Sequence, residues 1–130
     1  MVTLKLVSSM ALPCLLYATE ALPLSKTTFR SLEHPWSKVF MKMFTTFDAN
    51  TVLACQFYTG FMPVQHLASV RKIKFINSLA HSSHWLMRAL HDLVWNDELR
   101  PLASLYGVSV MNISINSRDI IRLSFENCIN

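Results

Sequence analysis

Acidic residues are the natural starting point for chemistry, because phosphoryl transfer to nucleic acid needs carboxylates close together to hold divalent metal ions. The eight Asp and Glu residues of this chain are scattered, and only Asp97 and Glu98 are neighbours. Adjacent positions on a helix point in different directions, so this pair is expected to complement a helix dipole. P-loop and GxSxG motifs are absent. We therefore expect no enzymatic activity.

Histidine and cysteine are the usual ligands of transition metals. If one helix ran through His81, His84 and His91, their spacing would suit zinc. The serines at 82 and 83 are typical of a helix start, however, and HExxH is absent, so surface or partly buried histidines are the favoured alternative. The three cysteines are far apart and odd in number, which indicates a reducing compartment, the cytoplasm or nucleus. No metal or cofactor is expected.

Basic residues form the most regular pattern in the chain. Five of them recur every four residues: Lys26, Arg30, His34, Lys38 and Lys42. On a straight helix this row winds slowly down one side, and apolar residues such as Trp36 and Phe40 take the opposite side. One face can therefore pack while the other contacts phosphates, which require charge rather than base-reading geometry.

A second basic cluster follows at residues 71–74. Either cluster alone is as consistent with a solvated helix face as with a binding surface, but the two together favour nucleic acid. The candidate phosphate-binding residues are Lys26, Arg30, Lys38, Lys42, Arg71, Lys72 and Lys74.

The spacing of apolar residues predicts helices from the N-terminus onward. The first covers residues 2–18, with a kink or an end at Pro13. Ser25 is expected to cap the second helix, which carries the basic row and should break near His34 because Pro35 disfavours a helical predecessor.

Further helix signals follow in the middle of the chain. Asp48 is a candidate N-cap, and Gly60 suits the left-handed end of the same short helix. Pro63 fits the first turn of a helix that extends to about Ala80. Ser82 or Ser83 is expected to cap the next one.

The C-terminal part has the weakest pattern. Asn96 is a candidate cap for a short helix that ends at Gly107. Residues 108–115 favour a strand by residue type, but no partner strand is evident. A last helix is expected at about 117–128. The fold class is therefore all-α, a small bundle of about five to seven helices.

Composition adds one constraint. The hydrophobic share is 52% and the charged share 15%, against about 25% charged residues in an average domain. Such a chain is expected to bury part of its surface against a larger polypeptide, a partner or a membrane. The apolar stretch at residues 6–17 is too short to span a bilayer. The net charge of +4 arises from the first three-quarters of the chain.

Residues 15–22, LLYATEAL, are the first of several segments that look familiar in order. They resemble the LLYG-x-E-x stretch that follows the catalytic palm of non-LTR (LINE-type) retrotransposon reverse transcriptases. Residues 29–32 and 40–44 resemble a helix that leads to an FMKLF-like run. CQFYTG at 55–60 and KFINSL at 74–79 resemble the next two elements.

This resemblance implies a thumb-like helical region at 1–95 and a C-terminal extension at 96–130. In that family the thumb grips the primer–template duplex through its backbone, which would give Lys26, Arg30, Lys38 and Lys42 their role. The palm and fingers would be its protein partners. Ala18 replaces a frequent Gly and Ala21 a frequent Trp, and the Ala-Asp-Asp catalytic motif is absent.

Two alternatives stay open. The N-terminal stretch also resembles a secretory signal, which would make the chain a small secreted helical protein that acts by protein–protein contact. The triplet Asn112-Ile113-Ser114 would then be a glycosylation acceptor. The other alternative is a translated relic without a function.

Overall fold

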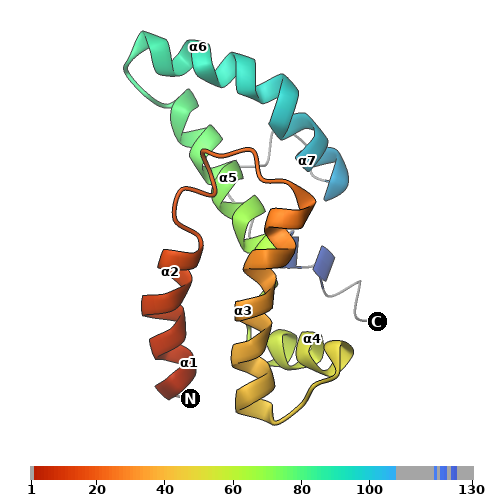
Figure 1. Ribbon diagram of the computed structural model, residues 1–130. Coiled ribbons are helices and arrows are strands. Elements are labelled where there is room, and N and C mark those ends of the chain that lie inside the picture. Colours follow the sequence, from red (N-terminus) through yellow and green to blue (C-terminus); the bar gives the residue numbers. More distant parts are fainter. Residues whose placement is uncertain (1, 108–118, 120, 123, 126–130) are drawn as a thin grey trace. The chain divides into compact units, whose positions relative to one another are not determined.

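The computed structural model describes residues 2–107, 119, 121, 122, 124 and 125. These residues lie in helices, turns and connecting loops with no strand among them, so the predicted all-α class is confirmed. Five continuous helical stretches occupy residues 2–105 (Figure 1), in agreement with the expected number. The strand-like segment 108–115, the glycosylation triplet and Cys128 lie outside the described residues. The last predicted helix is described at five positions, all helical.

Contacts group the chain into two compact units, Met1–Ala68 and Ser69–Asn130. The division predicted at residue 95 rests on the family resemblance and stays a prediction.

The first unit opens with one continuous helix made of α1 (Val2–Leu6), the π-helical turn η1 (Val7–Ala11) and α2 (Leu12–Leu15). A proline ring collides with the carbonyl group four residues before it. The wider π turn, which ends two residues before Pro13, relieves this collision, and the Leu12 N–H donates to the Val7 carbonyl five residues back. The helix does not end at Pro13 but continues to Leu15, three residues short of the predicted end at residue 18.

Helix α3 (Lys26–Phe44) begins where the sequence predicts. The Ser25 hydroxyl accepts a hydrogen bond from the Thr28 N–H at 3.2 Å. The predicted break near His34 is wrong, because α3 continues through Pro35 without interruption. Proline removes one backbone hydrogen bond, but Trp36 directly after it is buried in the core. Tertiary packing thus outweighs the local preference.

The core of the first unit lies on the apolar side of α3. The Trp36 ring contacts those of Phe40 and Phe61 edge-on, with centroids 5.2 and 5.8 Å away. Its indole N–H donates to the Met62 carbonyl at 3.2 Å. The buried members of this core cluster are Leu4, Leu16, Trp36, Phe40, Val52, Val64 and Ala68. The N-terminal helix therefore contributes to the same core as α3.

The remaining predicted boundaries of this unit agree with the structure. Helix α4 (Ala49–Tyr58) is capped by Asp48, whose carboxylate accepts from the Thr51 N–H at 2.8 Å. Gly60 has a φ of +78°, the left-handed conformation expected of it. Helix α5 (Val64–Ala80) starts directly after Pro63 and continues into the second unit.

The second unit contains the rest of α5, then α6 (Trp85–Val94), the π turn η2 (Trp95–Leu99) and α7 (Arg100–Leu105). The predicted serine cap of α6 is wrong, because the His84 Nδ1 accepts the Leu86 N–H at 3.2 Å. The predicted helix start at Asn96 is also wrong. The chain is helical without a break from α6 through α7, and a π turn again ends two residues before a proline, Pro101.

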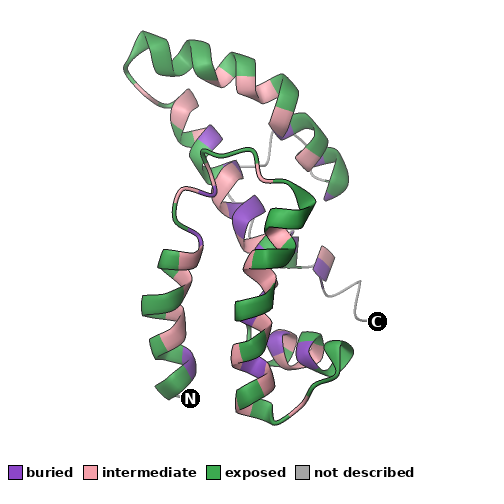
Figure 2. Ribbon diagram, viewed as in Figure 1, coloured by how far each residue is buried: buried purple, intermediate pink, exposed green. Residues whose placement is uncertain are grey.

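Burial is uneven in this unit. Its buried apolar residues are Val70, Ile73, Ile76, Leu99, Ala103, Tyr106, Ile121 and Phe125. Helix α6 has no buried residue, and Figure 2 shows no purple along it. The exposed side chains of Trp85 and Leu93 fit the apolar excess seen in the composition.

Candidate nucleic-acid interface

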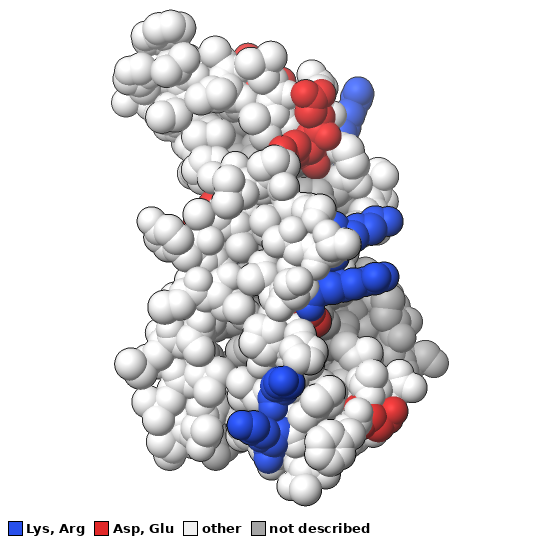
Figure 3. Space-filling view, viewed as in Figure 1, with Lys and Arg blue, Asp and Glu red and all other residues white. Residues whose placement is uncertain are grey.

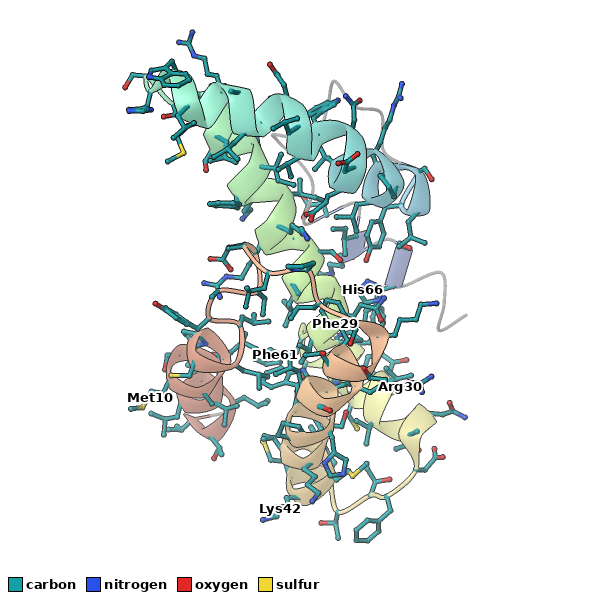
Figure 4. The ribbon with its side chains drawn as sticks, turned by 45° about the horizontal axis from the view of Figure 1, so that its top comes forward. Met10, Phe29, Arg30, Lys42, Phe61 and His66 are labelled. Atoms are coloured by element: carbon teal, nitrogen blue, oxygen red, sulfur yellow. The ribbon has the colours of Figure 1, made fainter. Side chains whose placement is uncertain are left out.

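The basic row on α3 is exposed along its whole length. All five members, at positions 26, 30, 34, 38 and 42, are exposed. Figure 3 shows Lys and Arg side chains protruding at several levels of this helix, and Figure 4 labels Arg30 near its start and Lys42 near its end. Each step of four residues advances about 6 Å along a helix axis, so the row extends over about 24 Å. This confirms the amphipathic α3 that the sequence predicts.

The charge of this row is not neutralised within the described part of the chain. The two ion pairs found there, Lys72 with Glu98 and His91 with Asp92, involve none of its members. The one acidic residue of α3 is Glu33. Its carboxylate accepts a hydrogen bond from the Val64 N–H at 2.7 Å and so faces the start of α5. The row is therefore a cationic surface without an acidic partner on its own helix.

The second predicted cluster lies in the second unit and is less open. The Lys72 side chain is 17% exposed and forms an ion pair with Glu98. Arg71 is half-buried, and Lys74 is exposed. The pairing of Lys72 leaves less positive charge here than residue types alone indicate. Of the seven candidate residues, the four on α3 are all exposed on one helix.

The sequence did not reveal the role of Glu33. Its carboxylate caps α5 from another helix, with hydrogen bonds from the backbone of Val64 and Gln65. The buried Gln56 amide approaches it without the geometry of a hydrogen bond. Burial raises the pKa of Glu33 above its usual value, and the hydrogen bonds oppose this shift. A cap that comes from 31 residues away has no local sequence signal.

Two cavities adjoin this carboxylate, since both are lined by Glu33 and Gln65. The first, of about 260 Å³, opens between α3 and the start of α5, where Lys26, Phe29 and Arg30 complete its lining. The second, of about 380 Å³, is lined by Glu33, Ser37, Met41, Ala49, Val52, Leu53, Pro63, Gln65 and His66. Figure 4 labels Phe29 on α3 and His66 on α5. Both cavities belong to the first unit.

The histidines make local contacts. The His84 ring caps α6, the His81 Nδ1 lies 2.9 Å from the Asn77 carbonyl oxygen, and the His91 Nδ1 lies 3.3 Å from an Asp92 carboxylate oxygen. Within the described positions, no three His, Cys, Asp or Glu side chains are grouped to hold a metal ion. In the same set of residues, no helix has the length and apolar character needed to span a bilayer.

We predict that Glu33→Gln changes how stability depends on pH. The raised pKa means that the wild-type carboxyl stabilises the folded state below its unfolded value of 4.5, and this contribution is lost as the pH rises through the folded pKa. Glutamine does not titrate. Urea unfolding at several pH values should show the variant gaining free energy of unfolding relative to wild type as the pH rises above 4.5.

His66 is a second group in this unit whose pKa is shifted, and its titration does not affect the comparison. Burial lowers its pKa from 6.5, so its contribution has the opposite sign and is lost as the pH falls. His66 is present in both proteins, so its effect cancels in their difference. A difference that stays constant from below pH 4.5 to above pH 6.5 would contradict the assignment of the titration to Glu33.

No protein-family model matches this sequence, and no curated protein or solved structure is significantly similar to it.

Proposed function

We propose that this chain is a non-catalytic module that binds a DNA or RNA duplex through its phosphate backbone. The observation that carries the proposal is the row on α3, in which Lys26, Arg30, Lys38 and Lys42 are exposed along one helix with no acidic partner among the described residues. The opposite side of α3 packs in the core through Trp36. A row anchored in this way presents its charges on a rigid support.

The spacing of the row favours contacts to phosphates over contacts to bases. The cations lie about 6 Å apart within each pair and about 12 Å apart across His34, so that they can follow a phosphate backbone along one helix. Such contacts position a protein on nucleic acid without reading its sequence. We therefore expect binding that depends on salt and is indifferent to sequence.

We further propose that the module is a thumb-like piece of a non-LTR retrotransposon reverse transcriptase that acts in the cytoplasm or nucleus. One feature of the backbone supports this resemblance. Ala18, which stands where the family often has Gly, has a φ of +58°. Glycine occupies this left-handed region without strain, whereas a Cβ atom makes it unfavourable.

Exposed apolar residues of the N-terminal helix fit the same proposal. Val2, Leu6 and Met10 recur every four residues along this helix and are each more than half exposed. In a parent polymerase this side would contact the palm or fingers. The side that carries Leu4 packs in the core of the first unit.

We predict that Ala18→Gly stabilises the protein by about 1 kcal/mol, because glycine relieves the left-handed conformation. Urea unfolding followed by circular dichroism would measure the change. Ala21→Gly is the matched control, since Ala21 lies in the same turn and does not have a positive φ. It should leave stability unchanged or lower it. Equal effects of the two substitutions would argue against strain at position 18.

The proposed function is tested by the salt dependence of binding. Fluorescence anisotropy of the full chain with two duplexes of unrelated sequence should give similar affinities. With four phosphate contacts, affinity should fall on the order of 100-fold between 50 and 200 mM salt. Binding that is insensitive to salt, or confined to one of the two sequences, would refute the proposal.

A further inference from the structure

The smaller of the two cavities lies beside the basic row and differs from it chemically. Its lining combines two members of the row, Lys26 and Arg30, with the aromatic ring of Phe29 and the polar side chains of Glu33 and Gln65. Four of these residues recur at intervals of three and four on the first two turns of α3, so they share one face of that helix. The fifth comes from the first turn of α5. A phosphate-binding edge thus adjoins a partly apolar hollow.

The position of Phe29 gives this hollow a fixed aromatic wall. The ring is half-buried and packs against the core cluster of the first unit. It also lines the cavity, so part of it faces the open space. A ring held in this way can stack against a flat partner without first being ordered.

The size of the cavity limits what it can hold. At about 260 Å³ it lies just below the range of roughly 300–1,000 Å³ typical of pockets for drug-sized ligands. A single nucleobase is a flat group that suits this size, and it carries hydrogen-bonding edges that the polar lining residues Glu33 and Gln65 can meet. The phosphates on either side of that base would be within reach of Lys26 and Arg30, the two cations of the lining.

We propose that this cavity receives one unpaired base of a strand whose phosphates lie on Lys26 and Arg30. This inference rests on the proposed function and makes the ligand more specific. A base inside a regular duplex is stacked and cannot enter a side pocket, whereas an overhang or a single strand can supply one. The preferred ligand is therefore a duplex that carries an unpaired nucleotide.

The test compares two labelled probes that have the same duplex and the same number of phosphates. One carries a short single-stranded overhang, and the other carries an overhang of abasic sugars. Stacking of one base on an aromatic side chain should make the full chain bind the first probe about 10-fold or more tightly than the second. The salt dependence of the two should be alike, because their phosphates are alike.

Variants at position 29 assign the preference to the ring. Phe29→Leu keeps an apolar side chain against the core and removes the aromatic face, so it should bind both probes equally. Phe29→Trp retains an aromatic face and should retain the preference. Circular dichroism would establish that both variants are folded.

The possible failures are distinct. Equal, salt-dependent binding of both probes by the wild type would overturn the base-pocket inference and leave the proposed function standing. A preference that persists in Phe29→Leu would also overturn it, since the base would then be held elsewhere. The absence of salt-dependent binding to either probe would overturn both proposals.

Discussion

Reversing two charges of the row, with Lys38→Glu and Lys42→Glu in one variant, is expected to lower affinity for duplex DNA by on the order of 100-fold at low salt. Two of four phosphate contacts are lost, and two carboxylates then repel the phosphates that remain nearby. Both side chains are exposed at the C-terminal half of α3, opposite Trp36 and the core. The fold should therefore tolerate the change, and circular dichroism would verify this.

The matched control for this variant is Lys5→Glu. Lys5 is exposed, belongs to the same unit and makes the same change of charge, but it lies on α1 and not on the row. If net charge alone determined affinity, Lys5→Glu, with one substitution, would lose affinity in proportion to the loss in the double variant. If the row binds the phosphates, the loss in Lys5→Glu should be several times smaller than that. A proportional loss in Lys5→Glu would reduce the proposal to a non-specific attraction.

Trp36→Ala is expected to lower the free energy of unfolding by about 3–5 kcal/mol. The indole ring is 2% exposed and contacts the rings of Phe40 and Phe61. Its removal leaves a cavity between them and leaves the Met62 carbonyl without its indole donor. Small domains have a total stability of roughly 5–15 kcal/mol, so the variant is expected to be largely destabilised.

Trp85→Ala is the control for this prediction, because the same residue type is there 74% exposed on α6. Its effect should be within about 0.5 kcal/mol of zero. Urea unfolding monitored by circular dichroism would measure both variants. If the two substitutions cost the same, Trp36 would not be the centre of the core that supports α3.

Features with a local cause were predictable from the sequence. Ser25 and Asp48 cap their helices through their own side chains, and Gly60 adopts the conformation that glycine alone adopts freely. The row on α3 is likewise local, since a repeat of four residues on a helix fixes one side. These signals involve residues a few positions apart, so no knowledge of the tertiary structure was needed.

Features with a distant cause were not predictable. The break expected at Pro35 is absent because Trp36 packs against residues far along the chain. The cap of α5 comes from Glu33, and the small cavity forms only when α3 meets α5. The residue types within one segment do not show which distant segments it packs against.

The continuity from α6 into α7 was missed for a different reason. Asn96 and Pro101 are typical of a helix start, and Pro13 is typical of a helix end. A π turn before each proline moves the obstructing carbonyl group and lets the helix continue. The steric conflict that the proline rule describes is real, but at Pro13 and Pro101 the backbone accommodates the ring by widening one turn.

The most direct test of the cationic row is the slope of log affinity against log salt for a series of neutralised variants. Lys26→Gln, Arg30→Gln, Lys38→Gln and Lys42→Gln would be combined one after another in the full chain, with Lys5→Gln as the control. We predict a slope of about −3.6 for the wild type with duplex DNA, which falls in magnitude by about 0.9 with each neutralised member of the row. Lys5→Gln should leave it unchanged. A slope that does not respond to these substitutions would contradict the assignment of phosphate binding to α3.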